Sequence, residues 1–234
     1  MKGVRNHVLL VCAATGTEYD ACLAGIRDAD LAGSFEVLQV GVGPRHAARS
    51  LRERLARGPA PSRILSCGFA GALGEGVSLG AWITAETLSE WQNGSLVPMA
   101  QPIAVASCMP CDVVSVDHLV GRNSPLRRAP RPSARPLVAD MESAALAAEA
   151  SARGIALSVV RLVSDTPEHP LPEFLSPFTA AMAGSDARAR TALLARGIGS
   201  ALTDPRGVAR LLVEGRTWTK KLREGFATLA PFLV

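Results

Sequence analysis

Apolar residues recur along this chain in short runs that alternate with segments of helical composition. Six runs have the length and apolar content of buried strands, and they cover residues 7–14, 35–42, 64–71, 79–88, 103–107 and 156–163. Helical character is strongest in three other segments, residues 19–28, 44–57 and 144–153. Strands that alternate with helices indicate an α/β fold. We therefore predict a single α/β domain in which helices cover a central sheet.

The C-terminal fifth of the chain has a different pattern. From residue 186 onward it resembles three short helices, separated at residues 197–199, at Asp204-Pro205 and at Gly215. The last of them carries an apolar stripe at helical spacing, formed by Trp218, Leu222, Phe226, Leu229 and Leu233. Such a stripe packs on its own domain or on a partner subunit, and a basic amphipathic end can also contact a membrane surface weakly. We expect a main domain at residues 1–184 and a packed helical extension at residues 185–234.

Composition narrows the functional class. The chain has 234 residues, 48% of them hydrophobic, and a formal net charge of +4. This mild charge does not argue for a nucleic-acid partner, which requires a dense basic face. Five cysteines, an odd number without framework spacing, are typical of reduced thiols, so we expect a cytoplasmic protein.

Acidic residues follow two of the predicted strands and open one predicted helix. Glu18 comes shortly after the first strand, and Asp165 comes after the strand at 156–163. Asp140 and Glu142 precede the helix at 144–153. Ligands of open α/β sheets bind beyond the carboxyl ends of the strands, which favours a site formed by these acids. A structural interpretation stays open, because acids also cap helices and favour their first turns.

Three sequence motifs resemble the nucleoside phosphorylase and nucleosidase superfamily, in particular its 5′-methylthioadenosine/S-adenosylhomocysteine nucleosidases. They are Asp-Met-Glu-Ser-Ala-Ala at 140–145, Val-Val-Arg-Leu-Val-Ser-Asp at 159–165, and Cys-Gly-Phe-Ala-Gly-Ala-Leu at 67–73. The spacing from Ala14 to Glu18 also matches these nucleosidases. The resemblance implies a mixed central β-sheet flanked by helices.

The resemblance also implies roles for individual residues. Asp165 would protonate the leaving purine, and Glu18 would orient the attacking water. Met141 and Glu142 would hold the ribose, with support from Arg161 and Ser164. The turn at Ala70 and Gly71 and the segment at Leu119 and Val120 would flank the substrate. We therefore expect three acids, distant in sequence, to converge around one ribose.

Two departures from the superfamily pattern favour hydrolysis. Related phosphorylases place a hydroxyl residue where this chain has Phe69 and an arginine where it has Ser66. The expected reaction is hydrolysis of the N-glycosidic bond of a 5′-modified adenosine of the methylthioadenosine, adenosylhomocysteine or adenosylhopane type, with release of adenine. Three alternatives stay open. They are a phosphate-dependent purine nucleoside phosphorylase with Arg45 and Arg63 as anion partners, a futalosine-type hydrolase, and a non-catalytic nucleoside-binding protein.

No metal or organic cofactor is expected. Cys108 and Cys111 lack the second cysteine pair of a structural zinc site, and the four histidines show no ligand spacing. The resemblance implies a homodimer that binds a small nucleoside, and the tail resembles that of the hopanoid-associated nucleosidase branch. Residues 121–136 lack periodicity and suit a mobile loop or lid over a site.

Overall fold

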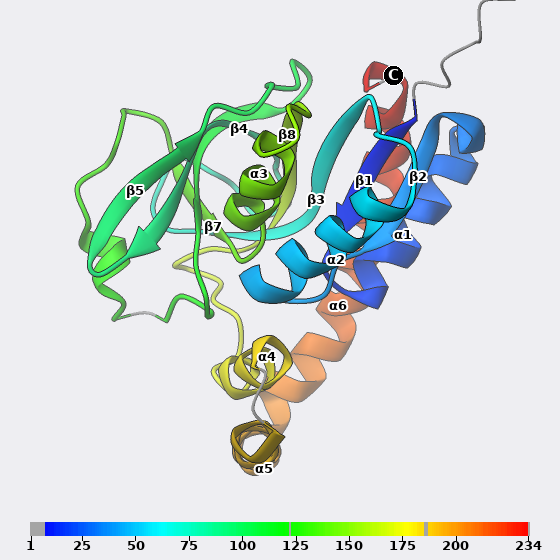
Figure 1. Cartoon of the computed structure of the whole chain (residues 1–234). Coiled ribbons are helices and arrows are strands. Elements are labelled where there is room, and N and C mark those ends of the chain that lie inside the picture. The colour runs from blue at the N-terminus through cyan, green and yellow to red at the C-terminus, as the bar shows by residue number, and fades with distance from the viewer. Residues whose placement is uncertain (1–7, 122, 185–186, 234) are drawn as a thin grey trace, which may run out of the picture.

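The computed structural model of this chain describes residues 8–121, 123–184 and 187–233 (Figure 1). The strands in that part are β1 (Leu9–Ala13), β2 (Phe35–Gln39), β3 (Arg63–Ala72), β4 (Trp82–Gln92), β5 (Ser95–Ala100), β6 (Met109–Ser115), β7 (Leu137–Asp140) and β8 (Leu157–Asp165). The α-helices are α1 (Gly16–Asp28), α2 (Pro44–Arg57), α3 (Ser143–Ser151), α4 (Leu175–Ala183), α5 (Ala187–Thr203) and α6 (Pro205–Leu229). Residue 7, the start of the first predicted strand, lies outside these ranges, and so does residue 185 at the proposed boundary. The division into a main domain and a packed extension stays a prediction.

The strands form one mixed sheet that closes on itself. Its linear order is β2-β1-β3-β7-β6-β4-β5, and β8 pairs with both β3 and β4. Strands β3, β7, β6, β4 and β8 therefore make a closed ring, from which β1 and β2 extend on one side and β5 on the other. Within the ring β8 is parallel to β3 and antiparallel to β4. The predicted mixed sheet flanked by helices is confirmed, and the closure of the ring is an additional finding.

Two pairs of helices cover the sheet. Helices α2 and α3 pack together on one face, where Leu51 and Leu146 join the apolar residues of the strands. Helices α1 and α6 pack together on the other face, where Ile26, Leu222 and Phe226 form a second core cluster. Burial of these apolar side chains supplies the main free energy that holds the helices on the sheet.

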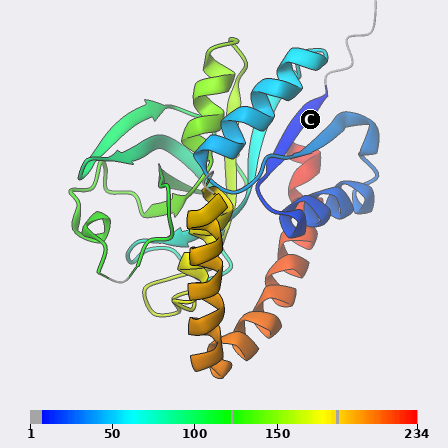
Figure 2. The same cartoon turned by 60° about the horizontal axis from the view of Figure 1, so that its bottom comes forward.

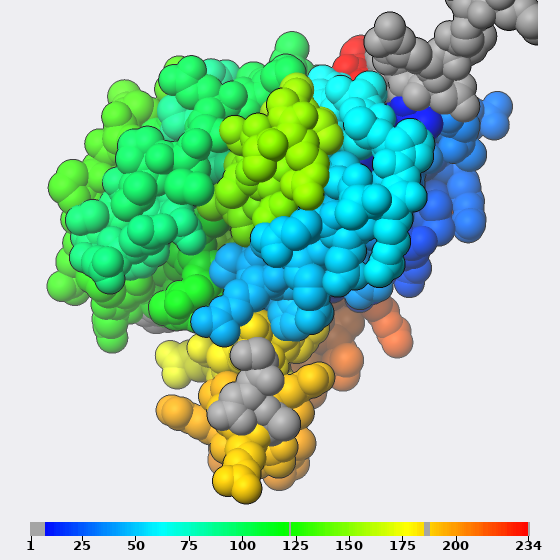
Figure 3. Space-filling view, viewed as in Figure 1, coloured from blue at the N-terminus to red at the C-terminus, as the bar shows by residue number. Residues whose placement is uncertain are grey.

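Helices α4 and α5 lie outside this layered body. Together with the first turns of α6 they project from one end of the molecule (Figures 1 and 3). Helix α6 starts at Asp204, whose side chain accepts a hydrogen bond from the Gly207 amide at 2.8 Å, with Pro205 as the first helical residue. The helix then runs back to the body, where the Phe226 ring meets Phe35 edge-on at 6.1 Å.

Several predicted elements need correction. Residues 103–107 are not a strand, and the strands β5, β6 and β7 were missed. The predicted strand at 79–88 is β4, displaced toward the C-terminus, and it forms a hairpin with β5 through Asn93 and Gly94. Both turn residues have positive φ, as a two-residue hairpin turn requires, so the Asn-Gly pair was an available signal.

The tail forms two long helices instead of three short ones. Only the break at Asp204 is confirmed, because α5 runs through residues 197–199 and α6 runs through Gly215. A glycine inside a helix costs only about 1 kcal/mol, which packing readily offsets. At Gly197 the absent side chain leaves space for the Phe178 ring of α4. The loop at 121–136 contains one short 3-10 helix, Pro125–Arg128, and residue 122 lies outside the described part.

Within the residues described here, none of the helices combines the length and the apolar character required for a membrane span.

Two glycines of α6 provide a matched test of how this helix packs against the rest of the protein. A Cβ atom at Gly225 would approach the Trp82 ring to 2.1 Å, whereas a Cβ at Gly215 meets nothing within 4 Å. We expect Gly225→Ala to lower the free energy of unfolding by about 1–3 kcal/mol through overpacking. Gly215→Ala should raise it by up to about 1 kcal/mol through helix propensity. Urea unfolding of both variants measures the two signs, and equal effects would contradict this packing.

Candidate active site

The carboxylate of Glu18 is held between the start of α1 and strand β3. Its Oε2 atom accepts hydrogen bonds from the Thr15 amide at 2.8 Å and the Thr15 hydroxyl at 2.9 Å, in a capping box. Its Oε1 atom accepts from the Phe69 amide at 2.8 Å. The side chain is buried, so these bonds fix its position at the carboxyl end of β1.

Gly68 lets two charged side chains approach the backbone of β3. A Cβ atom at this position would lie 2.3 Å from Glu18 Oε1 and 2.8 Å from Arg161 Nη1. Any larger residue would therefore displace the carboxylate or the guanidinium. Glu18 and Arg161 are thus neighbours across a strand position that requires glycine.

The guanidinium of Arg161 lies in the centre of the sheet, 1% exposed. Its Nη2 atom donates to the hydroxyls of Ser66 at 2.7 Å and Ser143 at 2.9 Å, and it forms an ion pair with Asp140. Asp140 in turn accepts from the Ser115 hydroxyl at 2.5 Å. Buried charges persist when they are paired and hydrogen-bonded, and this network meets both conditions.

Glu142 completes a group of carboxylates around this guanidinium. Its Oε2 atom lies 3.9 Å from Arg161 Nη2, and its Oε1 atom accepts from the Gly43 amide at 2.9 Å. Burial raises the pKa of Glu142 to about 8 against the opposing charge of Arg161, and the charges of Asp140 and Glu18 add to the rise. Three buried carboxyl groups thus share one guanidinium, and Glu142 is the group that favours its protonated form.

A cavity of about 470 Å³ opens at the carboxyl ends of several ring strands. Gly71 at the end of β3, Asp140 at the end of β7 and Asp165 at the end of β8 all line it. Met141, Leu119 and Val120 add apolar wall. Its size is that of a small-molecule site, and its position is the one expected for an α/β sheet.

Asp165 is a half-buried titratable group on the cavity wall. Burial raises its pKa, while a hydrogen bond from the Ser164 hydroxyl at 3.0 Å and the charge of Arg127 oppose the rise. A Cβ atom at Gly71 would lie 2.6 Å from Asp165 Oδ2, so glycine is required beside this carboxyl too. The Ser164 hydroxyl also lies 3.5 Å from the carbonyl oxygen of Ala70, which is itself buried.

The opposite wall of the cavity comes from the projecting helices. Helix α4 contributes Ser176, Pro177 and Ala180, and α5 contributes Leu193, Arg196 and Ser200. Ala183 of α4 packs beside Gly43. A Cβ atom added at Gly43 would lie 2.9 Å from the Cβ atom of Ala183. Helix α4 thus touches the same glycine turn that donates to Glu142.

The predicted site residues fall into two adjoining groups. Glu18, Glu142 and Arg161 form the buried cluster, whereas Asp165, Met141, Gly71, Leu119 and Val120 line the cavity. Met141 and Asp140 connect the groups, since they line the cavity and adjoin Glu142 in sequence. Glu18 and Glu142 are not among the cavity-lining residues, so their convergence with Asp165 on one ribose stays a prediction.

Sequence reasoning missed several polar residues of this region. Ser115 and Ser143 bind Asp140, and the Gly43 amide binds Glu142. Asp140 and Ser143 have the spacing of a helix-capping pair, a signal that the sequence did contain. Arg127 and Arg196 line the cavity from segments without any motif, and only the folded chain reveals them.

Comparison with known proteins supports the fold. No family model matches the chain, and no curated protein matches its sequence. Among solved structures, a futalosine hydrolase mutant of Helicobacter pylori matches with a TM-score of 0.57 and 14% identity, covering 82% of this chain and 99% of its own.

Two nucleosidase structures match to a similar extent. A 5′-methylthioadenosine/S-adenosylhomocysteine nucleosidase from H. pylori, with butyl-thio-DADMe-Immucillin-A, has a TM-score of 0.56 and 16% identity over 80% of this chain and 97% of its own. A putative nucleosidase of the same kind from Borrelia burgdorferi, bound to adenine, has a TM-score of 0.59 and 15% identity over 82% and 99%. At these identities the likeness concerns the fold alone, and this chain shares the fold of these nucleosidases and of the futalosine hydrolase.

Proposed function

We propose that this protein is an N-ribosyl hydrolase that cleaves the N-glycosidic bond of a purine nucleoside. The observation that carries the proposal is the placement of Asp165, a half-buried carboxyl with a raised pKa on the wall of a cavity of small-molecule size. The shared fold with nucleosidases and the matching motif around Ser164 and Asp165 support it.

The chemistry requires an acid that keeps its proton. Departure of a purine leaves a ribosyl cation, as in the oxocarbenium-like transition states of glycoside hydrolysis, and protonation lets the base leave neutral. A general acid acts best when its pKa lies near the working pH. Burial moves the pKa of Asp165 upward, in the direction that this role requires. The Ser164 hydroxyl holds the Asp165 carboxyl in one orientation.

Glu142 and Met141 are the proposed ribose contacts. Met141 lines the cavity directly, and the Glu142 carboxyl lies behind it with one oxygen bound to the Gly43 amide. Its second oxygen lies 3.9 Å from Arg161, beyond hydrogen-bond distance, so Arg161 leaves its acceptor positions to sugar hydroxyls. A carboxyl group with a pKa of about 8 can accept from ribose hydroxyls or donate to them.

Water is the proposed nucleophile, and Glu18 is the proposed group that orients it. Each Glu18 oxygen already accepts hydrogen bonds from Thr15 or Phe69, yet a carboxylate has about four acceptor positions. The hydroxyl of Ser66 is occupied by Arg161 and Ser143, and the Phe69 ring has no donor for phosphate. A phosphorylase stays the second candidate, because Arg127 and Arg196 give the cavity two cationic groups.

The helices α4 and α5 support a 5′-modified substrate. Pro177, Ala180 and Leu193 add apolar side chains to the cavity wall. With the base at Asp165 and the ribose at Met141, a 5′ substituent would extend toward these helices. This supports methylthioadenosine, adenosylhomocysteine or an adenosyl lipid as substrate classes, and futalosine stays an alternative within the same arrangement.

Replacing the acid tests the proposal directly. We expect Asp165→Asn to reduce adenine release from methylthioadenosine by about 10²–10⁴-fold, the usual contribution of a general acid, without loss of the fold. Asp117→Asn is the matched control, since the Asp117 side chain is exposed and paired with His118. Chromatographic detection of adenine measures both, and turnover like that of the wild type in the Asp165 variant would overturn the assignment.

A nucleoside panel in the presence and absence of phosphate separates the two reactions. A hydrolase releases base at the same rate in both conditions, whereas a phosphorylase requires phosphate. Binding of adenosine analogues to the wild type without turnover would instead support a non-catalytic protein.

The protonation of Glu142 is open to a pH experiment. Because its folded pKa is raised above the ordinary value of 4.5 to about 8, its contribution to stability is present at low pH and is lost as pH rises. Relative to Glu142→Gln, the wild type should lose more than about 1 kcal/mol between about pH 5 and about pH 9, since one unit of pKa shift is about 1.4 kcal/mol. Urea unfolding at both pH values measures the difference, and a constant difference would show that another carboxyl holds the proton.

A bulky side chain on α5 tests the 5′ pocket. We expect Leu193→Trp to lower kcat/KM for adenosylhomocysteine by about tenfold or more, and to affect adenosine much less. Leu202→Trp is the control on the same helix, since Leu202 is 78% exposed. An equal loss for both substrates, or no loss, would remove α5 from the specificity pocket.

A further inference from the structure

The net positive charge of this chain is concentrated in one part of the fold. We define the α5–α6 arm as residues 187–221, which contain eight basic and two acidic residues. The arm therefore has a formal net charge of +6, and the rest of the chain has −2. A charge separation of this size is a property of the surface and affects which partners approach it.

Exposed apolar side chains occur on the same arm. Ile198 and Leu202 of α5 are 54% and 78% exposed, and Leu212 and Val213 of α6 are 65% and 68% exposed. Ile198 and Leu202 are four residues apart and so share one face of α5. Single exposed apolar residues are ordinary, but here four of them lie on two helices that meet at one corner.

The arm presents these residues away from the rest of the protein. The two helices diverge from a corner at Asp204, which is the part of the molecule farthest from the sheet (Figure 2). On α5 the opposite face carries Leu193 and the buried Gly197, which meet the cavity and α4. On α6 the contacts with the body increase along the helix: Trp218 and Lys221 lie against Gly80, and the core residues start with the buried Leu222.

The predicted apolar stripe of the last helix has the first of the environments expected for it, its own domain. Leu222, Phe226, Leu229 and Leu233 of that stripe are buried against the body, so they pack within the domain. The surface that stays open for a weak membrane contact is a different one, on α5 and the first half of α6. The same two segments carry both apolar residues and arginines, a combination found in helices that lie in a bilayer interface.

The charge selects among the partners that could cover such a surface. A second copy of the arm would bring two surfaces of +6 together, which is unfavourable. Nucleic acid would match the charge but gives no reason for exposed leucine and isoleucine. An anionic lipid bilayer suits both the positive charge and the exposed apolar side chains, because its headgroups attract lysine and arginine while the acyl boundary receives apolar side chains.

We propose that the α5–α6 arm is a docking surface for an anionic lipid bilayer. Leu202, Leu212 and Val213 enter the headgroup boundary, and Arg206 and Arg216 contact the phosphates. Because α5 also forms a wall of the cavity, docking places the cavity next to the membrane surface. The proposal does not depend on the reaction that the cavity supports.

Sedimentation of the full chain with vesicles tests the proposal. The vesicles contain phosphatidylcholine alone or with about 30% phosphatidylglycerol, at about 0.1 M salt, where charges are moderately screened. We expect binding to the anionic vesicles that is at least about tenfold stronger than to the neutral ones, since each cation contributes about 1 kcal/mol. Leu202→Ser combined with Leu212→Ser should weaken it about tenfold or more.

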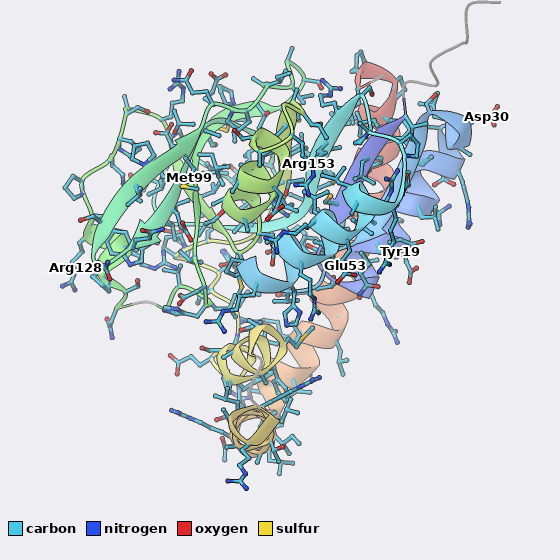
Figure 4. All side chains as sticks on the ribbon, viewed as in Figure 1. Tyr19, Asp30, Glu53, Met99, Arg128 and Arg153 are labelled. Carbon is cyan, nitrogen blue, oxygen red and sulfur yellow. The ribbon has the colours of Figure 1, made fainter. Side chains whose placement is uncertain are left out.

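A matched control uses apolar residues of the body. Met99 and Ile103 are 38% and 48% exposed, and Met99 lies on β5, away from the arm (Figure 4). Met99→Ser combined with Ile103→Ser should leave vesicle binding unchanged, and circular dichroism verifies that both double variants are folded. A second arm variant, Arg206→Gln with Arg216→Gln, should also weaken binding to anionic vesicles.

Three outcomes overturn the proposal. The first is no preference for anionic vesicles, and the second is an equal loss in the arm and body variants. The third is self-association in place of vesicle binding. In that case sedimentation velocity shows an oligomer for the wild type and a smaller species for the leucine double variant. Duplex DNA run in parallel identifies a nucleic-acid surface if it binds while the vesicles do not.

Discussion

The buried guanidinium of Arg161 is the interaction on which the rest of the site depends. It pairs with Asp140, lies 3.9 Å from Glu142 and adjoins Glu18 beside Gly68, so it connects β8, β7 and the start of α1. Removing one partner of a buried ion pair typically costs about 3–5 kcal/mol, because the other charge stays unpaired. Here a single loss would leave three carboxyl groups without their counter-charge. Burial raises the pKa of Glu142 to about 8, the charges of Asp140 and Glu18 add to that rise, and Arg161 opposes it. The group that holds the network together therefore also affects the protonation of Glu142.

The closed ring explains how distant acids come near one another. Strand β3 pairs with β1, β8 and β7, so residues just beyond three different strands meet along its carboxyl half. Its glycines at 68 and 71 remove the side chains that would otherwise occupy this space. One admits Glu18 with Arg161, and the other admits Asp165. A strand with two glycines is intrinsically weakened, and pairing on both sides compensates for that weakness.

Sequence patterns predicted the parts of the fold that depend on local order. The buried strands β1, β3 and β8 are short apolar runs, and Pro44 marks the start of α2. Helix α1 was predicted from residue 19, although it begins at Gly16 after the Thr15 cap. Strand β7 has four residues and joins β6 and β3 only in the folded chain, so periodicity could not reveal it. Ring closure and the serines around Asp140 are likewise long-range features. The motifs identified Asp165 and Glu142, but no local signal indicated that Arg196 of α5 would line the same cavity.

The C-terminal helices show why an apolar pattern alone does not determine whether its residues are buried or exposed. In α6 the same kind of stripe is buried beyond Leu222 and exposed at Leu212 and Val213, because only the second half of the helix reaches the body. Burial therefore depends on where the helix starts, and the Asp204 cap sets that start outside the sheet. Helix α5, joined to this corner, has a cavity on one face and solvent on the other. A change in how the arm is held would move Leu193 and Arg196 relative to Asp165, so the surface of the arm and the shape of the cavity are mechanically linked through one helix.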